Sequence, residues 1–343
     1  MANNTHKKPV VSFFHRKPRA VGNYSVEFIF DDVRERLKDK IVAKVVTSAY
    51  ESSGLFKRLY NCFQACFKQG PVNHVTGDVN YLGLLLNRGK TIHTILDCVY
   101  LNTAKGLKYK ILKLFWLSIP EKKSRFLTAI SESTKKEILK HHPCDPDKII
   151  VIPVAISPKF KYTPRAFNRE MPVILQIGTA PNKNIPNLIA AVKGIPCVLQ
   201  IVGKKVEEYE HLLKQNNIQY TYEWDLSNEE IIKKYEQADI ISLVSTYEGF
   251  GMPILEAQAI GRPVITSAIL SMPEVAGNGA CLVNPFNIEE IRKGLSKIIE
   301  DHHYREELIN AGIENCKRFD PDRIADQYLQ LYKKIMMDNG ISH

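Results

Sequence analysis

The sequence predicts an α/β protein with two doubly wound, Rossmann-like domains that face a central cleft. Short apolar runs rich in β-branched residues, such as 10–14, 41–48 and 173–178, alternate with segments of helical spacing along most of the chain. This alternation is typical of parallel sheets whose strands are joined by helices. With 343 residues, the chain also has the length of two ordinary domains.

A proline-containing stretch without periodicity, 157–172, is expected to link the two domains. The predicted boundaries are 1–165 for an acceptor-side domain and 166–321 for a second, ligand-binding domain. A C-terminal helix at about 322–338 is expected to pack back onto the first domain.

In the first half, the strand at 10–14 leads through a loop into a helix, with Gly22 where the strand turns into the helix. Residues 55–68 have helical spacing with several apolar side chains on one face. Further strands are expected at 41–48, 72–75, 91–96 and 148–156, with a helix within 103–119 and a strand followed by a helix within 125–133.

The second half alternates more regularly. Strands are expected at 173–178, 197–203, 238–245 and 281–287, with a short strand in 219–226. Helices are expected between them, and Ser227 and Glu230 have the spacing of a capping box at one helix start.

Charge is divided unevenly along the chain. Residues 1–165 hold 29 Lys and Arg against 13 Asp and Glu, a charge of +16, whereas residues 166–343 hold 18 against 24, a charge of −6. A basic half predicts contact with anions such as lipid phosphate, while no zinc spacing or RNA-reading motif supports nucleic acid. Seven cysteines without a Cys-x-x-Cys pair, and no apolar run long enough for a signal peptide or a spanning helix, predict a cytoplasmic protein.

The stretch 245–264, STYEGFGMPILEAQAIGRPV, carries the chemistry. It follows an apolar strand, and its glycines precede a helix for which Pro253 suits the first position and Gly261 the stop. Glycines and a helix start can cradle a phosphate, and the carboxylates of Glu248 and Glu256 can each accept two hydrogen bonds from sugar hydroxyls. This combination predicts a nucleotide-sugar site. The alternative is that both acids only favour the start of a helix.

Several segments together resemble one family. STYEGFGMPILEAQAIGRPVITS (245–267) resembles the signature of the family 4 retaining glycosyltransferases, which have the GT-B fold, and ILQIGTAPNKNIPNLIAAV (174–192) resembles another of its motifs. The segments 127–138, 148–160 and 271–291 also match in the family's order. The resemblance is strong over roughly 120–300 and weak before residue 120.

The resemblance implies roles for individual residues. Glu256 should bind the ribose hydroxyls, Glu248 with the backbone of Gly249, Phe250 and Gly251 should hold the donor sugar, and Lys183 should contact the diphosphate. The alternative for Lys183 is a lysine on a loop whose side chain is solvated and contacts no ligand. The donor-side candidates are Gly22, Gly178, Thr179, Lys183, Gly203, Trp224, Leu226, Glu248, Gly249, Phe250, Gly251 and Glu256, of which Lys183 and Glu248 are also predicted to be catalytic together with Asp97.

The sequence departs from the family pattern in two places. Thr179 and Asn182 stand where the family usually has basic residues, and Leu96-Asp97 stands where it commonly has His-Asp, with His93 three residues away. Asp97 stays a candidate on the acceptor side and for catalysis, with a loop cap as the alternative.

His74 and Trp224 are ambiguous. His74 is either an acceptor-side contact or a structural histidine, and Trp224 either stacks on the base or packs in a core.

No metal is expected to be required. The Asp-Pro-Asp runs at 145–147 and 320–322 imitate a metal-binding pattern, but both stand where caps are expected. No cofactor is expected besides the donor, a UDP- or GDP-linked sugar.

The sequence as a whole predicts a metal-independent retaining hexosyltransferase that uses a saccharide or lipid-linked acceptor in bacterial surface-polysaccharide synthesis. A GT-B-fold sugar-nucleotide epimerase, or a binding protein that has lost activity, are the alternatives. The basic segment 103–123, extended by the helix at 55–68, predicts peripheral contact with an anionic membrane on the inner face of the plasma membrane, unless its apolar residues face the core.

Overall fold

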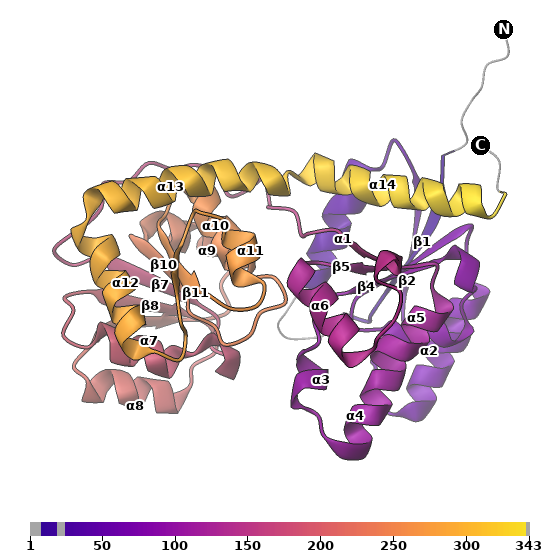
Figure 1. Cartoon of the computed structure of the whole chain (residues 1–343), viewed down its shortest axis with the longest axis horizontal. Coiled ribbons are helices and arrows are strands. Elements are labelled where there is room, and N and C mark those ends of the chain that lie inside the picture. The colour runs from indigo at the N-terminus through magenta and orange to yellow at the C-terminus, as the bar shows by residue number, and fades with distance from the viewer. Residues whose placement is uncertain (1–7, 19–24, 341–343) are drawn as a thin grey trace, which may run out of the picture. The chain divides into compact units, whose positions relative to one another are not determined.

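The computed structural model describes residues 8–18 and 25–340 (Figure 1). Gly22 lies outside the described residues. The chain divides into two compact units: unit 1 comprises residues 1–155 and 321–343, and unit 2 comprises residues 156–320. The expected boundary at 165/166 is therefore moved ten residues towards the N-terminus, and the C-terminal helix belongs to unit 1.

Unit 1 contains a parallel sheet in the order β2-β1-β3-β4-β5-β6. Its strands are β1 (Val10–His15), β2 (Val42–Thr47), β3 (Val72–Thr76), β4 (Thr91–Ile95), β5 (Phe126–Ala129) and β6 (Ile149–Val151). Its helices are α1 (Ser25–Arg36), α2 (Leu55–Phe67), α3 (Val99–Thr103), α4 (Gly106–Lys113), α5 (Ile119–Lys123), α6 (Glu132–His141) and α14 (Pro321–Asp338). Short 3₁₀ turns lie at Asn80–Leu85, Arg88–Lys90 and Pro146–Lys148.

A wide π turn, Leu114–Ser118, joins α4 to α5. Pro120 follows it and has no N–H to donate to the preceding turn. Local widening of this kind is a usual way for a helix to accommodate such a defect. The helical segment expected within 103–119 is thus divided into three short pieces, and lysines lie on α4 and α5.

One face of the unit 1 sheet is covered by α14, which brings tyrosines onto a buried histidine. His74 on β3 is inaccessible to solvent, and its Nδ1 lies 2.8 Å from the Tyr332 hydroxyl. Its Nε2 lies 2.8 Å from Oγ1 of Thr94, which in turn lies 2.7 Å from Oγ1 of Thr128. Phe30 of α1 packs edge-on against the same imidazole. Since both ring nitrogens have partners, the buried polar chain is compatible with a stable core.

The other face of this sheet is covered by α2 and the turn at Asn80–Leu85. Cys62 and Ala65 of α2 pack with Phe14, Val75 and Tyr81 in one buried cluster. Only a narrow stripe of α2 takes part in this cluster.

Unit 2 contains a second parallel sheet, in the order β12-β11-β10-β7-β8-β9. Its strands are β7 (Val173–Ile177), β8 (Val198–Val202), β9 (Gln219–Glu223), β10 (Ile240–Leu243), β11 (Val264–Ser267) and β12 (Cys281–Val283). Its helices are α7 (Ile185–Val192), α8 (Glu207–Gln215), α9 (Asn228–Gln237), α10 (Met252–Ile260), α11 (Met272–Ala276), α12 (Ile288–Glu300) and α13 (His302–Cys316), with 3₁₀ turns at Pro181–Lys183 and Lys317–Phe319.

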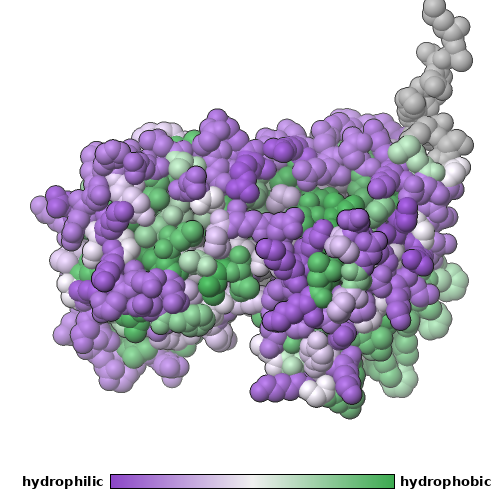
Figure 2. Space-filling view, in the orientation of Figure 1, coloured by the Kyte–Doolittle hydropathy of each residue, from purple (hydrophilic) through white to green (hydrophobic). Residues whose placement is uncertain are grey.

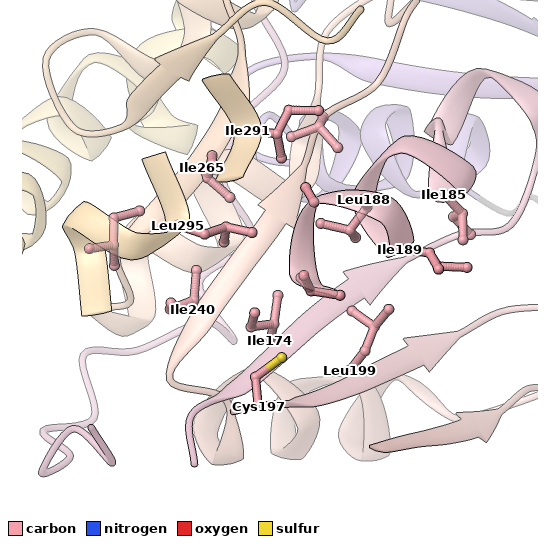
Figure 3. Packing of buried hydrophobic residues seen from close by; sticks show 14 of the residues in the cluster. Ile174, Ile185, Leu188, Ile189, Cys197, Leu199, Ile240, Ile265, Ile291 and Leu295 are labelled. Atoms are coloured by element: carbon pink, nitrogen blue, oxygen red, sulfur yellow. The ribbon is translucent and has the colours of Figure 1, made fainter. Parts of the chain in front are cut away.

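The core of unit 2 forms where α7 and α12 cover the sheet (Figure 3). Ile174 and Ile240 from neighbouring strands lie with Leu188 of α7 and Leu295 of α12 in one fully buried cluster. Central parallel strands are covered on both faces, which explains why they read as continuous apolar runs in the sequence. The loops of the candidate site follow the strands of this sheet.

The expected interdomain linker, 157–172, is instead bound along unit 2. The backbone N–H of Thr163 donates to the carbonyl of Ile260, and the Tyr162 ring lies where a Cβ on Gly261 would stand. The backbone N–H groups of Asn168 and Val173 both donate to the buried Asp239 carboxylate. Its prolines and lack of periodicity therefore mark an extended segment with its own partners, and a free linker is excluded.

Candidate nucleotide-sugar site

The candidate site lies at the carboxyl ends of the two central strands of unit 2. Strand β7 is the first strand of this unit, and the chain runs from it outwards to β8 and β9, then returns to β10 on its other side. The loops that follow β7 and β10 therefore diverge, and ligands of open α/β sheets bind at such a point. The loop after β7 carries Lys183 and the loop after β10 carries Glu248.

Lys183 and Glu248 form an ion pair between these loops. Nζ of Lys183 lies 2.6 Å from Oε1 of Glu248, and both side chains are largely shielded from solvent. The same oxygen accepts a hydrogen bond from Oγ of Ser245, at 2.7 Å. The solvated-lysine alternative for Lys183 is therefore wrong, because its ammonium is held at a defined position.

Gly178 makes room for this lysine. Its φ is +85°, and a Cβ built there would lie 2.9 Å from Cε of Lys183. A side chain at position 178 would thus strain the backbone and push Lys183 aside.

Asparagines fasten the two loops together. Nδ2 of Asn182 donates to the carbonyl of Tyr247 at 2.8 Å, and the N–H of Thr246 donates to the carbonyl of Asn182 at 2.8 Å. Asn184, with a φ of +58°, donates from Nδ2 to the carbonyls of Val244 and Pro285. Asn182, which departs from the family pattern, is thus uncharged, and its side chain joins the two loops by a hydrogen bond.

Helix α10 begins one residue earlier than expected. Gly251, with a φ of +102°, precedes Met252, so Pro253 is the second helical residue and Glu256 the fifth. Glu256 therefore lies in the second turn, and the first turn holds no acidic residue. The alternative that Glu256 only favours the helix start is wrong, and the positive end of α10 is left without an acid of its own.

The side chain of Phe250 in the glycine loop points into the core of unit 2. Phe250 is buried and packs edge-on against Phe319. Oγ of Ser271 donates to the carbonyls of Glu248 and Phe250, at 2.8 and 3.0 Å. These contacts fix the loop and make the Phe250 side chain a structural anchor.

The carboxylate of Glu256 accepts a hydrogen bond from the hydroxyl of Tyr235, which lies on α9 and is fully buried. Burial raises the pKa of the Glu256 carboxyl above its usual value, and the bond from Tyr235 acts against that rise. Tyr235 was not predicted from the sequence. A periodic apolar position on an amphipathic helix gives no sign that its hydroxyl reaches a carboxylate from another element.

A second row of candidates follows β8 and β9. Oγ1 of Thr179 donates to the carbonyl of Lys204, and a Cβ on Gly203 would lie 2.8 Å from the Thr179 side chain. Trp224 follows β9 with 53% of its surface exposed, so the core-packing alternative is wrong and its ring is free to stack. Leu226 is half-buried before the cap of α9.

Comparison with known proteins identifies unit 2. Residues 162–315 match the family model described as "Glycosyl transferases group 1". These residues are similar to that family. The match covers almost all of unit 2, including both loops of the candidate site.

Relatives of this family align with part of the chain. It is 26% identical over 233 residues to the O-antigen chain mannosyltransferase B of Escherichia coli, covering 61% of each protein. It is 26% identical over 221 residues to the MMP alpha-(1->4)-mannosyltransferase of Mycolicibacterium hassiacum, covering 61% of this chain and 54% of the relative. The match thus spans about three fifths or less of these relatives' lengths.

Solved structures extend the likeness to both units. HepE of Anabaena, in complex with UDP and glucose, superposes with a TM-score of 0.76 over 95% of this chain and 100% of that one, at 14% identity. The predicted fold, two Rossmann-like units of the GT-B type found in group 1 glycosyl transferases, is confirmed.

Two unit 1 candidates have structural partners. His74 is the buried core residue described above, so it is removed from the acceptor-side candidates. The Asp97 carboxylate accepts a hydrogen bond from the N–H of Val99 at the start of α3, which is the loop cap that the sequence left open. His93 is fully buried, with Nδ1 lying 2.6 Å from Oγ of Ser124.

Sequence reasoning missed a charged pair in unit 1. Arg16 follows β1 and Asp78 follows β3, and NH1 of Arg16 lies 2.6 Å from Oδ2 of Asp78. These strands flank the point at which the connections of this sheet diverge. The position of Arg16 directly after the first strand was the feature of the sequence from which this pair could have been predicted.

The Asp-Pro-Asp runs have caps and ion pairs as partners. The Asp145 carboxylate accepts from the N–H of Asp147, and Asp322 forms an ion pair with Arg36. Across residues 8–18 and 25–340, no group of three or more His, Cys, Asp or Glu side chains is arranged to hold a metal. Within the same residues, no helix combines the length and apolarity needed to cross a bilayer.

Proposed function

We propose that the protein is a glycosyltransferase that moves a hexose from a UDP- or GDP-linked donor to a saccharide or lipid-linked acceptor, with retention of anomeric configuration. The observation that carries the proposal is the Lys183–Glu248 ion pair at the diverging loops of unit 2, beside a helix start without an acid. The family match of residues 162–315 supports it.

Lys183 has the electrostatic role. As the glycosidic bond breaks, the leaving nucleoside diphosphate gains negative charge, which a nearby ammonium and the free N–H groups of a helix start stabilise. Because Thr179 and Asn182 are uncharged, Lys183 is the cation on which this stabilisation depends in the loop after β7. Its partner Glu248 holds it ready before the donor arrives.

Glu248 has the sugar-binding role. Its Oε1 is occupied by Lys183 and Ser245, and a carboxylate has further lone pairs to accept bonds from hydroxyls. When the Lys183 ammonium moves towards the diphosphate, Oε1 of Glu248 also becomes able to accept a hydrogen bond from a sugar hydroxyl. One ion pair would thus be exchanged for two sets of contacts, to phosphate and to sugar.

The nucleoside is proposed to lie along the carboxyl edge of the sheet. Glu256, held by Tyr235, accepts bonds from the ribose hydroxyls, and Trp224 stacks on the base. Trp224 follows β9, two strands from β7, which corresponds to about 10 Å at the usual strand spacing. Lys204, between them, is exposed and offers a second cation near Thr179.

The remaining parts of the proposal concern the proton, the metal and the acceptor. No general base is assigned, and a donor phosphate oxygen takes the acceptor's proton. No metal is required, since Lys183 and the start of α10 supply the positive charge. The acceptor is bound by unit 1, in cell-surface polysaccharide synthesis at the inner face of the plasma membrane; the relative that makes O-antigen chains and the basic charge of residues 1–165 support this.

A panel of nucleotide sugars tests the proposal, with product analysis in the presence and absence of saccharide acceptors and of a chelator. Transfer with the same anomer in product as in donor, unaffected by the chelator, is the expected result. An epimerised nucleotide sugar without transfer would identify an epimerase, and binding without any turnover by the intact chain would identify a binding protein.

A further inference from the structure

Helix α2 of unit 1 turns its most apolar face to solvent. Phe56 and Phe67 are 86% and 84% exposed, and the side chains between them on the same face are exposed too. The face consists of Phe56, Leu59, Tyr60, Phe63 and Phe67. These positions follow the spacing of one helix stripe. Figure 2 shows hydrophobic residues gathered where Figure 1 places α2.

This face is distinct from the one that α2 packs into unit 1. The buried side chains of α2 are Asn61, Cys62 and Ala65. Small and polar residues thus face the core, while the large aromatic ones face outwards. Single exposed apolar residues are ordinary, but a contiguous aromatic stripe along a whole helix marks an interaction surface.

Charge determines which partner fits the stripe. Lys57 and Lys68 lie beside it on the polar side of α2, and an exposed lysine, Lys44, lies on the edge strand β2 of the same unit. A second helix of unit 1, α4, combines the exposed Leu107 and Ile111 with three lysines of its own. Two copies of so basic a unit repel each other, whereas an anionic surface attracts it.

We propose that the aromatic stripe of α2 inserts into the interface of an anionic lipid bilayer, with the lysines of α2 and α4 at the headgroups. Helices with an apolar face flanked by cations lie in the plane of a bilayer in this way. Its biological purpose rests on the proposed function, since a lipid-linked acceptor would be reached at that surface, but the contact itself does not.

Of the two segments predicted to contact the membrane, 103–123 and the helix at 55–68, the structure favours the helix, which is α2. In the segment 103–123, Leu112 and Phe115 pack against buried clusters, and Trp116 is half-buried. Only Leu107, Ile111 and Leu114 remain exposed there.

Vesicle sedimentation tests the contact with the full chain. Vesicles of equal parts phosphatidylglycerol and phosphatidylcholine should bind it, and vesicles of phosphatidylcholine alone should bind it far less. Phe56→Ser with Phe67→Ser should lower partitioning by about tenfold or more, because each removes a large buried apolar area from the bound state. Phe286→Ser, in unit 2 and 67% exposed, is the matched control and should leave partitioning unchanged.

Three results would overturn the proposal: no binding to anionic vesicles, equal losses in the Phe286 control, or loss of self-association in the double variant as measured by sedimentation velocity. The last would make the stripe a dimer interface. Circular dichroism confirms that the double variant is folded. Calorimetric titration of the unaltered chain with a nucleoside diphosphate tests the proposed function separately, since its failure would leave vesicle binding intact.

Discussion

Each unit has a charged pair where the connections of its sheet diverge, but the two pairs have different surroundings. In unit 2, Lys183 and Glu248 lie with hydroxyl and amide groups beside a helix start that has no acidic residue. In unit 1, Arg16 and Asp78 stand at the corresponding place, while much of the polar chemistry is buried in the sheet around His74. The same topology therefore gives unit 2 the candidate nucleotide-sugar site, whereas unit 1 has a buried histidine network and an apolar outer helix.

The largest effect is expected from breaking the unit 2 pair. Lys183→Ala should lower turnover by a factor that corresponds to roughly 3–4 kcal/mol, with a smaller loss of donor affinity, because the leaving-group charge peaks in the transition state. Glu248→Ala should impair transfer while affinity for a bare nucleoside diphosphate stays nearly intact. Steady-state kinetics and calorimetry measure both, with the exposed Lys193→Ala as control. Equal losses of nucleotide binding in both variants would contradict these separate roles.

A smaller effect is expected at Glu256. Glu256→Ala should weaken nucleotide binding by about 1.5–3 kcal/mol, the range for hydrogen bonds to a charged group. Tyr235→Phe removes one bond to this carboxylate and should cause part of that loss. Unchanged affinity of the Ala variant in a calorimetric titration would remove Glu256 from the site.

The two units should respond to pH in opposite directions. Burial lowers the pKa of His93 to about 3 and that of His74 well below its usual range, so unfolding of unit 1 takes up protons as pH falls below about 6.5. His93 alone should destabilise unit 1 by about 2 kcal/mol at pH 5 relative to pH 8. The raised pKa of Glu256 works the other way: its stabilisation of unit 2 is present below the pKa of the unfolded carboxyl and is lost as pH rises through the folded value.

Hydrogen exchange followed by peptide mass spectrometry separates these responses. Glu256→Gln should make unit 2 more stable at neutral pH while weakening nucleotide binding, and it should leave exchange in unit 1 unchanged. Parallel loss of protection in both units on acidification would contradict the assignment to the histidines.

The smallest effect is expected from breaking the pair in unit 1. Arg16→Ala should lower the stability of unit 1 by about 1 kcal/mol, since the Asp78 carboxylate is partly exposed and water replaces its partner. Nucleotide affinity should not change. A loss of nucleotide binding as large as that of Glu256→Ala would show that the unit 1 pair belongs to the donor site.

Strands and their order of appearance could be predicted from the sequence because buried parallel strands are continuous apolar runs. The loops of the site could be placed for a related reason: Lys183 and Glu248 each follow such a run directly. What failed were assignments that depend on contacts between distant elements. Only tertiary packing shows that α14 covers His74, that Tyr235 reaches Glu256, and that Asp239 binds the segment expected to be a linker.

The contacts of helix faces could not be predicted, for a different reason. The periodicity of α2 locates an apolar stripe but does not say what the stripe contacts, so a surface stripe and a core stripe look alike. Trp224 illustrates the converse, since an aromatic residue after a strand predicts a core and is in fact exposed.

The division of the chain into units has a consequence for the order of synthesis. Unit 2 is one continuous segment, 156–320, and its sequence is complete when Asp320 leaves the ribosome. Unit 1 begins first but finishes last, because α14, with Tyr328 and Tyr332, is made only at the end. Domains made N-terminal first generally fold first. In this chain, the sheet of unit 1 lacks the helix that covers it, and His74 lacks its tyrosine partner, until unit 2 has been translated.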